Sequence, residues 1–135
     1  MARDHRKLRV FHDAHQLTLA TYQHPRDFPR HEWYAVRLQM RKAAVSIPSN
    51  IVEGNARRHT AEYIHFLNIA RASAAELTYL VDLARELAYL TGSTFKDLND
   101  RCNRVCPQLQ SLLQAMEALL VEEEAERRGK RVPDK

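Results

Sequence analysis

The stretch that decides the fold of this 135-residue chain is WYAVRLQMRKAAVSIPSNIV, residues 33–52. Six of its apolar side chains fall within about 40° of one direction on a helix of 3.6 residues per turn. The residues of this first stripe are Trp33, Val36, Met40, Ala44, Ile47 and Ile51. Such a stripe is typical of a helix packed against a core, so we expect a helix over residues 31–56. Pro48 cannot donate a backbone hydrogen bond and predicts a kink or a restart within it.

The same helix carries a second apolar stripe, about 120° to 160° away from the first. Its members are Tyr34, Leu38, Val45 and Val52. A helix in a small bundle needs one apolar face, and a continuous exposed apolar patch is unusual on a monomer. We therefore expect these four residues to form an interface with another copy of the chain.

Residues 10–24 and 60–92 also repeat apolar side chains at spacings of three and four. Thr60 is expected to cap the second of these helices, and Gly92 is expected to end it. Within this helix, apolar and small residues fill three heptad positions, as in helix bundles. They are Tyr63, Ala70, Leu77 and Ala84 at a, Phe66, Ser73, Leu80 and Leu87 at d, and Leu67, Ala74, Val81 and Ala88 at e.

A fourth helix is predicted to open with a capping box formed by Thr94 and Asp97. Its core stripe alternates spacings of three and four through Phe95, Leu98, Cys102, Val105, Leu109, Leu112, Met116 and Leu119. After Leu120 the chain is strongly charged, so we expect the helix to fray into a disordered tail. These patterns predict a basic segment at 1–9, a bundle at 10–126 and a basic disordered tail at 127–135.

The fold class that these segments predict is all-α. With only 3 glycines and 5 prolines, the chain lacks the turns of a β-sandwich, and four amphipathic segments with short connections favour an antiparallel up-down-up-down four-helix bundle. No apolar stretch approaches the roughly 20 residues of a membrane span, and no signal-peptide core is present. Two cysteines four positions apart fit a reducing compartment, so we expect a cytoplasmic protein without membrane contact.

Charge is distributed unevenly along the chain. Residues 1–58 carry 11 Lys/Arg against 5 Asp/Glu, residues 59–126 carry 5 against 11, and residues 127–135 carry 5 against 1. One interpretation is a phosphate-binding face for RNA or DNA. The other is pairing of basic residues with acidic helix residues such as Glu62, Glu76 and Asp82, within the bundle or between subunits. The basic residues in question are Arg37, Arg41, Lys42, Arg57 and Arg58.

Signs of enzymatic chemistry are weak. A di-iron bundle uses two Glu-x-x-His pairs, whereas Glu62 and His65 form one pair and no second is present. Cys102 and Cys106 fall on core positions with no histidine nearby in sequence to act as a base, so they are expected to be small buried hydrophobes. We expect no catalytic residue, no metal, no cofactor and no small-molecule substrate.

Two stretches carry a family resemblance: QMRKAAVSIPSNIVEG at 39–54 and RRHTAEYIHFLNIARASAAEL at 57–77. They resemble the bacterial four-helix bundle proteins first described as products of intervening sequences inside 23S ribosomal RNA genes. Residues matching the family signature are Ile47, Pro48, Asn50, Glu53 and Gly54. The chain departs from the family where glycine is usual, with Ala35, Ala72 and Ala88 at those positions.

The resemblance implies a left-handed up-down-up-down bundle, a ring-like homo-oligomer with five subunits favoured, and no known enzymatic activity. Related bundles that accompany diversity-generating retroelements have a basic surface and bind nucleic acid and a reverse transcriptase. The residues of this chain that match basic positions of the family are Arg41, Lys42, Arg57 and Arg58. A gene inside ribosomal RNA does not make its product ribosomal, so no ribosomal role follows.

The leading hypothesis is a non-enzymatic oligomer that binds RNA or DNA through a basic face of the second helix and the loop after it. The alternative is a structural or protein-interaction module without nucleic-acid binding. Gly54 is expected to end the second helix with a positive φ, which leaves Arg57 and Arg58 exposed. Replacing both arginines with alanine is then expected to change stability by no more than about 0.5 kcal/mol.

Overall fold

A computed structural model of the chain describes residues 3–24 and 31–130, with the side chains of residues 31 and 32 left aside. The elements are a short 3-10 helix η1 (His5–Lys7), α1 (Arg9–Gln23), α2 (His31–Asn55), α3 (Thr60–Glu86) and α4 (Gly92–Lys130). These ranges contain four α-helices and no strand, which confirms the all-α class.

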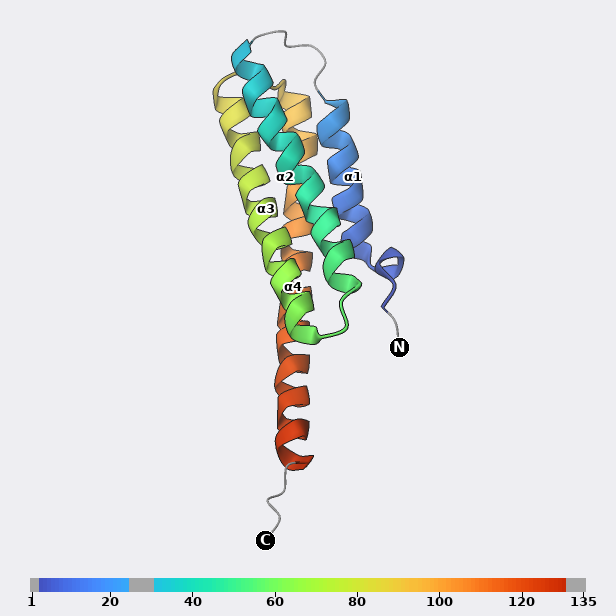
Figure 1. Cartoon of the computed structure of the whole chain (residues 1–135). Coiled ribbons are helices and arrows are strands. Elements are labelled where there is room, and N and C mark those ends of the chain that lie inside the picture. Colours follow the sequence, from blue (N-terminus) through green and yellow to red (C-terminus); the bar gives the residue numbers. More distant parts are fainter. Residues whose placement is uncertain (1–2, 25–30, 131–135) are drawn as a thin grey trace.

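The four helices lie side by side as a bundle (Figure 1). α2 packs against α1 and α3, and α4 packs against the same two helices. The α2–α3 connection lies at the lower end of the view, the α3–α4 connection lies at the upper end, and α4 extends well below the other helices (Figure 1). None of the described helices is long and apolar enough to cross a membrane.

The core is built from the predicted stripes. Trp33, Met40, Ile47 and Ile51 of α2 are almost completely buried, while Val36 packs half-buried at the edge. The buried residues of α4 are Thr94, Leu98, Cys102, Val105, Leu109 and Leu113. Of the predicted α4 stripe, Phe95, Leu112, Met116 and Leu119 are half-buried, and Leu113 is buried in place of Leu112. The sequence-based assignment of the core-facing side is therefore confirmed for α2 and for residues 98–109 of α4.

The end of α3 differs from the expectation, because the helix stops at Glu86 and Gly92 is instead the first residue of α4. Ala88 has a φ of 60°. The backbone N–H of Tyr89 donates to the carbonyl of Ala84 at 2.8 Å, as in a Schellman motif. This left-handed position normally favours glycine, and alanine occupies it here.

Both predicted caps are wrong. The N-cap of α3 is His59, which makes no side-chain capping bond, and the Thr60 hydroxyl donates to Glu123 Oε1 at 2.8 Å. At the start of α4, Thr91 Oγ1 accepts the backbone N–H of Thr94 at 3.2 Å. α4 therefore begins earlier than predicted, and Thr60 joins two helices because a carboxylate of α4 lies within its reach.

Asp97, the other member of the predicted capping box, links α1 to α4. Its carboxylate oxygens lie 3.0 Å from His24 Nε2 and 3.1 Å from Arg101 Nε. Burial alone would raise the pKa of Asp97, but the hydrogen bonds and charges of these two neighbours hold it below its ordinary value. Asp97 thus fastens the end of α1 instead of capping its own helix.

Two helices continue where the sequence suggested interruption. α2 passes through Pro48 as one helix, without a restart. α4 continues past Leu120 to Lys130, so the predicted fraying does not occur there, and residues 131–135 of the predicted tail lie outside the described residues. Glutamates precede basic residues by four positions in this stretch, a spacing that stabilises helices. These pairs are Glu123 with Arg127, Glu124 with Arg128 and Glu126 with Lys130.

Candidate functional site

The α2–α3 junction depends on close packing at Gly54. This glycine lies inside α2, and no glycine in the described chain has a positive φ, so the predicted backbone role is wrong. A Cβ added at Gly54 would lie 2.8 Å from Phe66 Cβ and 2.9 Å from Tyr63 Cδ1. Glycine is needed here because α3 approaches the α2 backbone closely.

A buried polar pair follows directly after this glycine. Asn55 Nδ2 donates to the Tyr63 hydroxyl at 2.9 Å, and both side chains are almost completely buried. Asn55 Oδ1 has no hydrogen-bond partner among the described residues. Burial raises the pKa of Tyr63, and the Asn55 hydrogen bond and the charge of Arg3 offset part of that rise. The hydroxyl therefore stays protonated and acts structurally.

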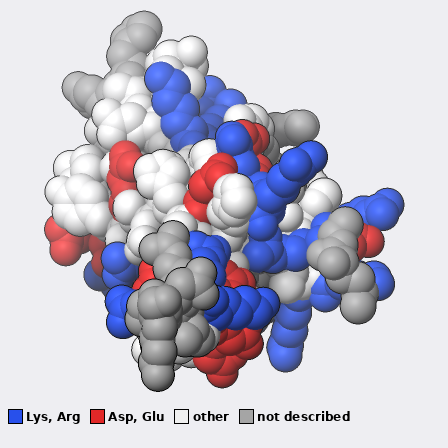
Figure 2. All heavy atoms as spheres, turned by 60° about the horizontal axis from the view of Figure 1, so that its bottom comes forward, with Lys and Arg blue, Asp and Glu red and all other residues white. Residues whose placement is uncertain are grey.

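Arg3 brings the N-terminal segment to this junction. Its guanidinium lies 4.6 Å from the centre of the Tyr63 ring, and its Nη1 donates to the backbone carbonyl of Arg57 at 3.0 Å. η1, which carries Lys7, also contacts α2. We call Arg3, Lys7, Arg57 and Arg58 the basic end. Lys and Arg side chains spread over this end of the molecule, with carboxylates between them (Figure 2). The sequence predicted a role for the two loop arginines, Arg57 and Arg58. It did not predict the contact of Arg3 with Arg57, because the two residues are 54 positions apart and no local sequence pattern connects them.

The two loop arginines differ in their surroundings. Arg57 Nη2 lies 2.6 Å from Glu53 Oε1, Arg57 Nη1 lies 3.8 Å from Glu62 Oε2, and the guanidinium stacks 4.8 Å from the Phe66 ring. Arg58 is exposed and has no ion pair with any described residue, and the same holds for Lys7. Arg57 is thus partly neutralised, whereas Arg58 remains available to an external anion.

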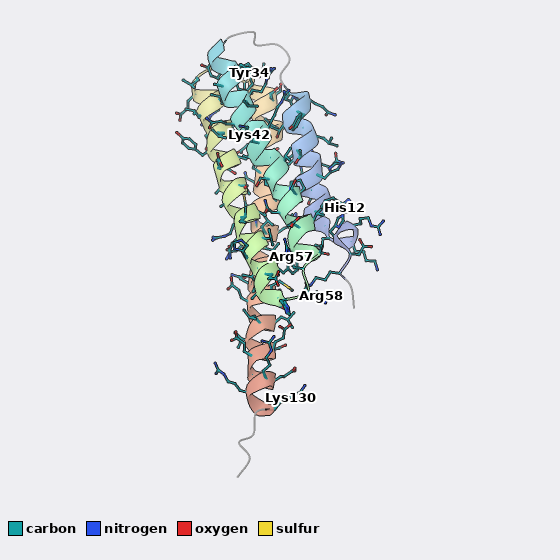
Figure 3. All side chains as sticks on the ribbon, in the orientation of Figure 1. His12, Tyr34, Lys42, Arg57, Arg58 and Lys130 are labelled. Atoms are coloured by element: carbon teal, nitrogen blue, oxygen red, sulfur yellow. The ribbon has the colours of Figure 1, made fainter. Side chains whose placement is uncertain are left out.

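The remaining basic candidates lie elsewhere. Lys42 lies in the upper half of α2, and Arg57 and Arg58 lie at the lower end (Figure 3). At about 1.5 Å per helical residue, the two groups are separated by more than about 20 Å. Arg41 Nη2 donates to the backbone carbonyl of Tyr22 at 3.1 Å, and the Arg41 guanidinium lies 4.9 Å from the centre of the Tyr22 ring. The five predicted basic residues, Arg37 included, do not form one continuous site.

The predicted interface stripe is present on the surface. Tyr34, Leu38 and Val45 are exposed by 59%, 41% and 38%, while Val52 is half-buried. The guanidinium of Arg37 lies 5.6 Å from the Tyr34 ring. Three of the four residues are therefore free to contact another molecule.

The potential catalytic groups occupy structural positions. Burial raises the pKa of the Cys102 thiol to about 11, which suppresses its nucleophilic form. Cys106 Sγ lies 3.9 Å from the Thr78 hydroxyl. His65 is exposed, and in the described part of the chain no three His, Cys, Asp or Glu side chains gather to hold a metal.

One shallow groove of about 320 Å³ runs between the start of α1 and the middle of α4. Its lining is mainly apolar and includes Leu8, Val10, Pro107 and Leu112, with Arg9 as its titratable side chain. Ser111 also lines the groove, but none of the other lining residues is a base that could activate its hydroxyl.

The buried stripes and the packing of the helices define a four-helix bundle protein. A sequence profile of the family described as 23S rRNA-intervening sequence protein matches residues 6–111, and the chain belongs to this family. The resemblance seen in residues 39–54 and 57–77 is thereby confirmed.

Among solved structures, the fold is similar to that of a protein with unknown function from the S23 ribosomal protein family of Bacteroides thetaiotaomicron. The two share 22% sequence identity and a TM-score of 0.70, over 78% of this chain and 95% of that chain. At this identity the likeness shows the fold alone. No match was found among curated proteins.

Proposed function

We propose that this chain is a non-enzymatic, homo-oligomeric bundle of up-down-up-down order that binds RNA or DNA through its basic end. The observation that carries the proposal is the Arg3 contact with Arg57, which adds the N-terminal segment to the loop arginines. Nucleic-acid affinity comes largely from Lys and Arg contacts to phosphates. Lys7 and Arg58 are suited to this role because no described carboxylate pairs with them.

Self-association is the second part of the proposal, with a ring of five subunits as the form that the family resemblance favours. The composition and the two cysteines favour the cytoplasm as its location. The exposed residues Tyr34, Leu38 and Val45 support it, because large apolar side chains in one row are unfavourable in water. We expect light scattering to show an oligomer at micromolar concentration. Leu38→Glu with Val45→Glu is expected to stay helical and give smaller species, because buried unpaired carboxylates are costly. A monomeric wild type would contradict self-association.

A structural or protein-interaction module remains the competing function. It is favoured by the ion pairs of Arg57 with Glu53 and Glu62, which neutralise part of the basic end within the chain. Under this alternative, Lys7 and Arg58 would be ordinary solvated side chains.

A salt titration of nucleic-acid binding separates the two functions. Fluorescence anisotropy with labelled single- and double-stranded RNA and DNA would be measured for the wild type and for Lys7→Ala with Arg58→Ala. The matched control is Arg71→Ala with Arg104→Ala, which removes the same charge from exposed positions of α3 and α4. We expect weaker binding in the first variant and a salt slope smaller by about one for each phosphate that the variant no longer neutralises.

Equal weakening in both variants would show that net charge, and not the basic end, is responsible. No binding of the wild type at low ionic strength would reject the nucleic-acid function and leave the interaction module.

A further inference from the structure

The exposed apolar surface is wider than the stripe on α2, because α1 contributes to it. Leu19 and Tyr22 of α1 are exposed, and Arg41 fastens Tyr22 to α2 through its carbonyl and its ring. A second contact, from the Thr18 hydroxyl to the Ala44 carbonyl at 2.9 Å, holds the two helices together. The α1/α2 face is defined as Leu19, Tyr22, Tyr34, Leu38 and Val45.

The α1/α2 face is also basic. Arg37 and Arg41 lie against its tyrosines, and Lys42 is exposed beside them. Within the described ranges, none of these three side chains forms an ion pair with a carboxylate. Its counterpart should therefore combine apolar area with negative charge.

α3 carries such a surface on its outward side. Tyr79 is 62% exposed, and Leu83, one turn later, is half-buried. Glu76 and Glu86 are exposed at spacings of three and seven residues from Tyr79, so they lie on the same side of the helix. The α3 face is defined as Glu76, Tyr79, Leu83 and Glu86. Among the described residues, neither of its glutamates forms an ion pair.

The two faces cannot meet within one chain. α3 turns Ser73 toward Ser46 of α2 at 2.7 Å and Thr78 toward Cys106 of α4, which leaves Tyr79 pointing outward. In the described chain, the ion pair that joins the basic first half to the acidic second half is Arg57 with Glu62, and the His24 ring contacts Asp97 at 3.0 Å. The opposite charges of the two faces therefore remain unpaired among the described residues.

Both faces lie at the same height along the bundle. α2 begins at the upper end, where α3 finishes (Figure 1), and Tyr34 and Lys42 lie in the upper half of α2 (Figure 3). Residues 76–86 are the last turns of α3. Two copies placed side by side in the same orientation would bring one face against the other.

We propose that the α3 face of one copy docks on the α1/α2 face of a second copy. This inference rests on the proposed self-association and names its two surfaces. Tyr and Arg side chains commonly dominate binding at such interfaces, and the opposite charges set the pairing. Because the two surfaces differ, the contact is heterologous and repeats from copy to copy, so it builds a ring or an open chain.

Charge reversal on each face provides the test. Variant A carries Glu76→Lys and Glu86→Lys, and variant B carries Arg37→Glu and Lys42→Glu. In variant A both faces are basic, and in variant B both are acidic. Light scattering should therefore show that each variant alone falls to monomers at physiological salt, while circular dichroism shows that it remains helical.

Mixing the variants should restore species larger than monomers, because A and B can alternate with opposite charges in an open chain or in a ring with an even number of subunits. A ring of five would keep one like-charged contact. A chain that carries all four substitutions should also self-associate. The control is Glu117→Lys with Glu124→Lys, which makes the same charge change on exposed positions of α4 and should keep the wild-type mass. Tyr79→Ser, which removes apolar area without a charge change, should weaken assembly at least tenfold.

The outcomes distinguish a failure of the proposed docking of the two faces from a failure of self-association itself. A monomeric wild type would reject self-association itself. An oligomeric wild type with variant A and Tyr79→Ser unchanged would overturn the α3 face as the docking surface and leave self-association standing. Dissociation of A and B without recovery in the chain that carries all four substitutions would also overturn the pairing of these two faces.

Discussion

The two ends of the bundle are closed in different ways. At the lower end, α2 and α3 pack backbone to side chain at Gly54, Asn55 bonds Tyr63 in the interior, and Arg3 fastens the N-terminal segment over them. At the upper end, α3 and α4 are joined by a backbone turn with Ala88 at positive φ.

This difference indicates that the lower end contributes to the stability of the single chain and that the upper end contributes to association between copies. The contacts of Gly54 and of the Asn55–Tyr63 pair at the lower end are buried, so changes there should alter the stability of the single chain. At the upper end, Tyr34 and Tyr79 remain exposed, so changes to these two side chains should mainly alter association. The following predictions test this contrast by urea unfolding at fixed protein concentration, because association affects apparent stability.

The largest expected effect is at Gly54. Gly54→Val places a branched side chain where even a Cβ would be 2.8 Å from Phe66 Cβ, and we expect a loss of about 2–3 kcal/mol in unfolding free energy. The control is Gly129→Ala in α4, where an added Cβ meets nothing within 4 Å. The control should change stability by less than about 1 kcal/mol. Equal stability of both variants would show that the helices do not meet closely at Gly54.

The buried hydroxyl at the lower end should have the next largest effect. Tyr63→Phe leaves the Asn55 amide without its partner, and we expect a loss of about 1–2 kcal/mol. Tyr89→Phe is the matched change at the upper end, where no hydrogen bond of the Tyr89 hydroxyl is present among the described residues, and it should be nearly neutral. A similar loss of unfolding free energy in both variants would show that the two ends do not differ in their contribution to stability.

Ala88→Gly should stabilise the protein by about 1 kcal/mol. Its φ of 60° penalises a Cβ, whereas glycine adopts this conformation without strain. The same substitution at the exposed helical position Ala118 should destabilise by about 1 kcal/mol. Opposite signs for the two changes are the decisive result, and a loss at Ala88 would contradict a strained turn.

The smallest effects concern the loop arginines, and they refine the prediction for the double replacement. Arg58→Ala should shift stability by no more than about 0.5 kcal/mol, because the side chain is exposed and has no ion pair with any described residue. Arg57→Ala should cost about 1 kcal/mol, since it removes the stacking on Phe66 and the Glu53 ion pair. Equal effects would show that the contacts of Arg57 contribute nothing.

Sequence periodicity determined the four helices, their buried sides and the exposed second stripe of α2. These features depend on the spacing of apolar residues within one helix, which is local information. The predicted caps failed for two reasons: three hydroxyls lie close together at the start of α4, and the hydroxyl predicted to cap α3 bonds to another helix. Thr91 caps α4, whereas Thr60 finds a carboxylate of Glu123 on another helix.

The tertiary structure alone decided the relations between helices. Gly54 had been interpreted through its backbone freedom, but its role comes from the distance to α3, and the basic residues separated into two groups according to their height along the bundle. Arg3 reaches Arg57 across 54 positions. Such contacts depend on the packing geometry of the helices and on the position of each side-chain terminus. The periodicity of a single helix does not predict either of them.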